Sequence, residues 1–195
     1  MPVPAMFMAF SEQVPSGVKM RHALGWWWHT PGDLLDKIDP ENLARDARIY
    51  LETVHRLLTD AVLPIDHIAQ LDSLAGELIR LDGVREHGMP LDGLAQRTTA
   101  LRERLVRARE ELDAERLNRV ILRICRALVP LDCTLGDRFA HDPALPLPSW
   151  PVLDPLRRLA PSELASDAAR HTAVAARRAC NRVAHALAEA SAALG

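Results

Sequence analysis

Residues 91–112 read LDGLAQRTTALRERLVRAREEL, and this stretch indicates the fold more clearly than any other. Its core-facing positions alternate in steps of four and three, through Leu94, Thr98, Leu101, Leu105, Ala108 and Leu112. Such a seven-residue repeat is typical of an amphipathic helix whose apolar seam packs against other helices. The spacing therefore predicts a long helix, beginning at about Leu91, in a helical bundle.

The same spacing continues downstream after a change of phase. Apolar residues recur at Leu117, Ile121, Ile124 and Leu128, but the step from Leu112 to Leu117 is five. A step of five turns the apolar stripe away from its previous face, because a helix has 3.6 residues per turn. Two structures fit this pattern: one helix that kinks near residues 113–116, or two helices that meet there.

Further helices are predicted on both sides of this region. Asp39 and Asp66 are favourable N-caps, and Pro40 suits the first position of a helix. Apolar residues then recur at spacings of three and four over residues 43–57 and 68–81. A final alanine-rich helix is expected over about residues 162–194. The fold class is therefore mainly α, a bundle of four to five helices.

Residues 130–162 are rich in proline, which excludes a long helix there. Apolar residues interrupt the segment, so it does not have the composition of a flexible linker. We expect it to lie extended over the surface of the bundle, held by Phe139, Leu145, Leu147, Trp150, Val152 and Leu153.

The first ten residues, MPVPAMFMAF, differ from the rest of the chain. Residues 2–10 form a short apolar run between prolines and polar residues, which is typical of one buried strand. A single strand needs neighbouring strands to pair its backbone groups, and no second strand is evident in the sequence. This strand and the loop-like residues 11–38 therefore predict a fragment of a sheet whose other strands lie elsewhere.

Composition narrows the classes of function. The formal net charge is −2, and arginines alternate with acidic residues, so neither nucleic acid nor an anionic membrane surface is an expected partner. The three cysteines, Cys125, Cys133 and Cys180, have neither disulfide nor zinc-knuckle spacing. The N-terminus has neither a basic region nor a cleavage site, so we expect a cytoplasmic protein without a membrane span.

The most conspicuous chemical candidate is the loop GWWWHTPGDLLDKIDPENL at residues 25–43. It places Trp26, Trp27 and Trp28 directly before His29, and several acidic residues follow. A lone histidine in a loop is by default a surface residue, because a zinc site requires three or four protein ligands. Taken by its residues alone, the chain has one distinctive loop and no complete active site.

The segment WWWHTPGDLLDKID resembles the Tyr/Trp-His-Thr-x-x-Asp-Thr-x-Asp-x-Ile motif near the end of the catalytic domain in the di-zinc exopeptidases. The resemblance implies that His29 is the last zinc ligand, with Trp28 and Thr30 beside it and Asp33 and Asp36 at the acidic positions. Two residues depart from the motif: Leu34 stands where threonine is usual, and Gly32 where an acidic residue is frequent. Both positions lie C-terminal to His29, and the proposed ligand itself matches the motif.

The resemblance also extends to the helical part of the chain. The stretches LNRVILRICRALVPLDCTLGDRFAHDPALPLPSWPVLDPLRRLA and RRACNRVAHALAEA are similar to the transferrin-receptor-like dimerisation domain of some members. PVPAMFMAF is similar to the strand that precedes the ligand loop in that family. The resemblance implies that residues 1–38 are the remnant of a catalytic α/β domain and that residues 39–195 are a helical homodimerisation domain. Residues 26–28 would form a wall of the substrate cleft for a peptide. The complete enzyme would hold two zinc ions.

The remaining ligands of that family, and its general-base glutamate, have no counterpart in this sequence. The chain would therefore contribute no catalytic residue and have no peptidase activity alone. One alternative is a non-catalytic helical dimerisation or interaction module with a vestigial ligand loop. Another is an independent metal-binding protein that uses His29 with scattered acidic residues.

Overall fold

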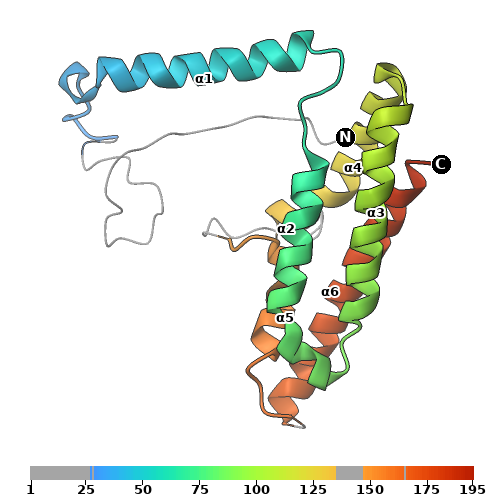
Figure 1. The fold of residues 1–195 in the computed structure, drawn as a ribbon. Helices are drawn as coiled ribbons and strands as arrows, with labels where there is room; N and C mark the ends of the chain where they lie inside the picture. Colours follow the sequence, from blue (N-terminus) through green and yellow to red (C-terminus); the bar gives the residue numbers. More distant parts are fainter. Residues whose placement is uncertain (1–26, 28, 135–146, 165) are drawn as a thin grey trace. The chain divides into compact units, whose positions relative to one another are not determined.

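The computed structural model describes residues 27, 29–134, 147–164 and 166–195, and these are mainly helical (Figure 1). The predicted helical bundle is therefore confirmed. The predicted strand at residues 2–10 lies outside the described residues. The chain divides into two compact units, Met1–Asp60 and Ala61–Gly195. The division after residue 38, which rests on the family resemblance, stays a prediction.

The N-terminal unit contains a short 3-10 helix, η1 (Leu35–Lys37), and one long helix, α1 (Pro40–Thr59). Asp39 caps α1 as predicted, since its carboxylate accepts hydrogen bonds from the backbone N–H groups of Glu41 (2.8 Å) and Asn42 (3.1 Å). Among the described residues of this unit, none is buried. The apolar stripe of α1 thus has no core within the described part of its own unit.

The C-terminal unit contains the remaining elements. They are α2 (His67–Arg80), η2 (Asp82–His87), α3 (Leu91–Glu111), α4 (Ala114–Cys133), η3 (Pro151–Leu153), α5 (Asp154–Leu159) and α6 (Asp167–Ala192). Helix α6 packs against α3, α4 and α5, and α2 packs against α3 (Figure 1). The core between them consists mainly of leucine, isoleucine, valine and alanine side chains. Among the described residues, no helix is both long enough and apolar enough to cross a membrane.

The change of phase after Leu112 is a boundary between two helices. Helix α3 ends at Glu111, and Asp113 caps α4 by accepting a hydrogen bond from the Arg116 N–H at 2.8 Å. Each helix then buries its own stripe independently: Leu94, Leu101 and Leu105 in α3, and Leu117, Ile121, Ile124 and Leu128 in α4. Of the two structures that the spacing allowed, the chain adopts two helices.

The expectation of an extended proline-rich segment on the surface is wrong for residues 151–159. This part forms η3 and α5, and Trp150, Val152, Leu153, Leu156 and Leu159 are all buried in the core. The prolines permit this because Pro151 and Pro155 stand at the first and second positions of the two short helices, where no intrahelical N–H bond is needed. Phe139 and Leu145 lie outside the described residues.

Candidate functional site

The predicted ligand loop forms a tight turn between Trp27 and Asp33. The Thr30 hydroxyl donates a hydrogen bond to the Trp27 carbonyl (2.6 Å) and accepts one from the Gly32 N–H (3.1 Å). The Asp33 carboxylate accepts a longer bond from the His29 N–H (3.4 Å), and the Asp33 N–H donates to the Thr30 carbonyl (3.0 Å). The two conspicuous polar residues of the motif, Thr30 and Asp33, thus brace the backbone on either side of His29.

His29 is exposed, and its backbone adopts a left-handed conformation with φ of 60°. A non-glycine residue in this region is uncommon and carries some strain, which the surrounding turn offsets. Trp27 is half-buried, whereas Trp26 and Trp28 lie outside the described residues. No group of three or more histidine, cysteine or acidic side chains suited to a metal forms among the residues that the structure describes. The role of His29 as a zinc ligand stays a prediction.

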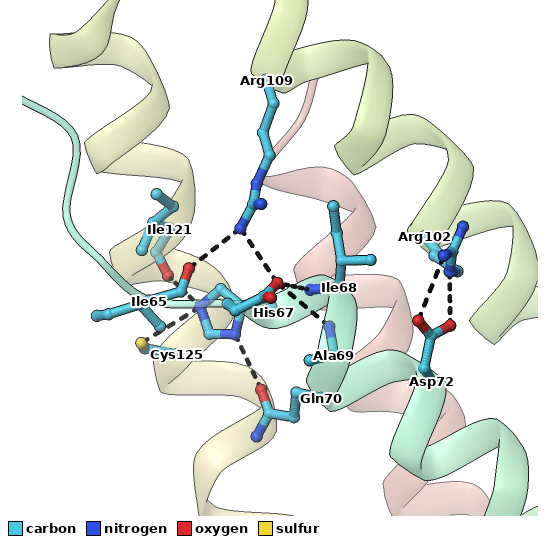
Figure 2. A network of polar contacts seen from close by, with 11 residues as sticks. Ile65, His67, Ile68, Ala69, Gln70, Asp72, Arg102, Arg109, Ile121 and Cys125 are labelled. Carbon is cyan, nitrogen blue, oxygen red and sulfur yellow. Dashed lines mark hydrogen bonds and ion pairs between the residues drawn. The ribbon is translucent and has the colours of Figure 1, made fainter.

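A second polar cluster, which the sequence did not predict, surrounds His67 at the start of α2 (Figure 2). The side chain is 2% exposed. Its Nδ1 lies 2.9 Å from Oε1 of Gln70, while its Nε2 lies 3.1 Å from the Ile121 carbonyl oxygen and 3.4 Å from Sγ of Cys125. Both ring nitrogens therefore have polar partners, and one side of the ring contacts α4.

Neighbouring side chains extend this cluster. Gln70 Nε2 donates to the Asp132 carboxylate at 3.1 Å, which leaves Oε1 of Gln70 facing Nδ1 of His67. Arg109 from α3 donates to the Ile65 carbonyl (3.2 Å) and to Asp66 (3.3 Å), the residue that caps α2 (Figure 2). The cluster thus joins the first turn of α2 to α3 and α4.

The surroundings of Cys125 decide what this cluster can do chemically. A cysteine beside a histidine is the arrangement of a nucleophilic dyad, which requires a thiolate. Here burial raises the pKa of the Cys125 thiol above its ordinary value of 9.0, so the thiol stays protonated near neutral pH. Both nitrogens of His67 are also occupied by protein groups. The cluster therefore holds helices together and is neither a dyad nor a metal site.

Sequence reasoning missed this cluster because its members are far apart in the chain. His67 and Cys125 are 58 positions apart, and His67 and Ile121 are 54 apart. Only the fold of α2 against α4 brings them together. One local feature could have drawn attention to His67: it directly follows the N-cap Asp66, so it stands in the first turn of α2.

Comparison with known proteins does not assign the chain to a family. Neither a protein-family model, nor a curated protein, nor a solved structure matches the chain.

Proposed function

We propose that this chain is the C-terminal part of a zinc-dependent exopeptidase of the aminopeptidase type, carrying its last zinc-ligand loop and a helical dimerisation domain. The observation that carries the proposal is the turn at residues 27–33. The residues that resemble the peptidase motif are the same ones that brace the turn: Thr30 bonds both flanks and Asp33 accepts from the His29 N–H. The motif thus has a local structural role around its histidine.

The geometry of the turn suits presentation of a ligand. Zinc binds a neutral imidazole nitrogen at about 2.0–2.1 Å, so the ring must be accessible and its backbone must be held. His29 is exposed, and the hydrogen bonds of Thr30 and Asp33 hold the backbone beside it. A single histidine does not hold a catalytic zinc ion. The remaining ligands and the glutamate base would come from a catalytic domain that precedes this segment.

The difference between the two units also supports the proposal. Ala61–Gly195 has an extensive buried core of its own. By contrast, the described residues of Met1–Asp60 include a long amphipathic helix and no buried side chain. An amphipathic helix is stabilised mainly by burial of its apolar face. The proposal accounts for this contrast: the ligand loop would pack against a preceding catalytic domain, α1 would bury its apolar face in the dimer, and the C-terminal unit folds on its own core.

Two measurements test the proposal. The purified chain should retain no stoichiometric zinc after dialysis and should not hydrolyse amino-acid anilides; chelator-sensitive turnover by the chain alone would contradict it. The DNA upstream of the Met1 codon should also encode, in frame, the missing ligands: a His-x-Asp segment, a Glu-Glu pair and a further aspartate. An upstream frame without them would leave His29 without co-ligands, and the proposal would fail.

A second candidate is a non-catalytic module that associates with a second copy of itself. It is favoured by the apolar stripe of α1, where Leu43, Val54 and Leu57 are 58%, 41% and 37% exposed. Sedimentation at micromolar concentration would then show a dimer that Val54→Glu dissociates. Arg48→Gln, which changes the charge by the same amount on the opposite half of α1, is the matched control. A wild-type monomer would exclude this candidate.

A further inference from the structure

A groove of about 420 Å³ runs between α4 and α6 in the C-terminal unit. Each helix contributes one face to it, with residues spaced by three and four positions: Arg123, Arg126 and Ala127 from α4, and Arg182, His185 and Ala186 from α6. Ala127 and Ala186 are less exposed than the arginines that neighbour them on their helices. Their small side chains leave the space that the longer arginine side chains border.

The charge of this groove is unusual for the molecule. The whole chain has a formal net charge of −2, yet three arginines line the groove against one acidic residue, Glu189. Arg123 and Arg126 are exposed and make no hydrogen bond or ion pair with any residue that the structure describes. Elsewhere in the same unit many arginines are paired, as Arg102 is with Asp72 and Arg157 with Glu77. Arg123 and Arg126 therefore bring to the groove positive charge that no described residue neutralises.

We propose that this groove binds a small organic phosphate, a phosphate monoester with a compact apolar body. Arginine donates to phosphate oxygens through a planar, forked guanidinium, and guanidinium groups from two helices border the same hollow. The floor of Ala127, Ala186 and the buried Leu131 offers hydrocarbon contact to the organic part. The volume lies within the usual range of about 300–1,000 Å³ for small-ligand sites. This proposal is independent of the proposed peptidase relationship.

The experiment uses phenyl phosphate as the probe and the full chain as the receptor. Titration is followed by NMR through the backbone amides and the arginine Nε–Hε groups, and by calorimetry. We expect saturable shift changes at residues 123–131 and 182–189, with weaker binding at higher salt. The affinity for phenyl phosphate should exceed that for inorganic phosphate, because only the ester reaches the apolar floor.

A test variant and a control variant distinguish binding in the groove from a general attraction of phosphate to positive surface charge. Arg123→Gln/Arg126→Gln should weaken phenyl phosphate binding at least about tenfold, since it removes charge-assisted hydrogen bonds from two guanidinium groups. The control, Arg48→Gln/Arg97→Gln, removes the same charge at two exposed arginines elsewhere and should leave the affinity within about twofold. All four side chains are exposed, so both variants should fold, which circular dichroism checks.

Three outcomes would overturn the proposal. One is the absence of saturable shifts in the groove. Another is equal weakening in the test and control variants, which would indicate a diffuse charge effect. The third is equal affinity for inorganic and phenyl phosphate, which would remove the role of the apolar floor.

Discussion

Among the residues that the structure describes, His67 is the buried polar residue with the most partners from other elements. Its ring contacts Gln70 on its own helix and the Ile121 carbonyl and Cys125 thiol on α4. A buried polar group contributes to stability only while its partners are present, and removal of one partner leaves the others without hydrogen bonds. The cluster therefore links the packing of α2 to that of α4.

Replacing His67 by alanine should destabilise the C-terminal unit by about 2 kcal/mol or more, because it leaves a cavity and deprives Gln70 of a partner. Urea unfolding followed by circular dichroism measures the change. His55→Ala, an exposed histidine on α1, is the matched control and should change stability by less than about 0.5 kcal/mol. Equal stability of His67→Ala and the wild type would contradict the structural role.

The raised pKa values of two cysteine thiols predict how the stability of the protein depends on pH in the alkaline range. Burial raises the pKa of Cys125 and Cys180 above their ordinary value of 9.0 in the folded protein. Well below pH 9.0 the thiols are protonated in both states and contribute no pH dependence. As pH rises through 9.0 the unfolded chain loses thiol protons first, so the free energy of unfolding should fall as pH rises above that value. Cys125→Ala/Cys180→Ala should flatten this decline; an unchanged slope would contradict the assignment.

At the scale of elements, the proline-rich segment departs most from expectation. Trp150 has a left-handed backbone with φ of 50°, is 0% exposed, and donates its indole N–H to the Ser73 hydroxyl on α2 at 3.2 Å. Arg157 on α5 donates to the Trp150 carbonyl (3.3 Å) and to Glu77 (2.6 Å). The sequence indicated that these apolar residues pack, but it could not indicate that they enter the core as helical turns.

Trp150→Ala should therefore destabilise the C-terminal unit by about 3–5 kcal/mol, the usual range for removing a buried large aromatic side chain. Chemical unfolding of the variant measures the loss. Its counterpart is Trp27→Ala, in which a half-buried tryptophan of the N-terminal unit is removed and the same transition should hardly change. Comparable losses in the two variants would contradict burial of Trp150.

The helix boundaries show where local sequence is sufficient. Asp39 and Asp66 were predicted as caps from their own position, and each accepts from two backbone N–H groups. The sequence pattern alone does not decide the boundary at Asp113, because a step of five between apolar residues fits either a kinked helix or two separate helices. His67 and Cys125, 58 positions apart, meet only through tertiary packing, which no local pattern encodes.

At the scale of the whole molecule, the chain combines two units of different character. Ala61–Gly195 contains the buried core, including the cluster around His67 and the packed proline-rich segment. A domain with its own core can fold alone. Residues 61–195, produced separately, should therefore unfold cooperatively, with a urea midpoint close to that of the corresponding transition in the full chain. A non-cooperative or unfolded fragment would contradict the independence of this unit.

The proposed function depends most directly on His29 as a zinc ligand. On this proposal, a longer protein that contains this chain and supplies the other ligands should bind two zinc ions per chain and hydrolyse amino-acid anilides. The decisive measurement is the zinc content and activity of its His29→Ala variant beside the His55→Ala control. We predict that His29→Ala loses zinc and turnover whereas His55→Ala keeps both. Full zinc occupancy and activity in His29→Ala would contradict the account.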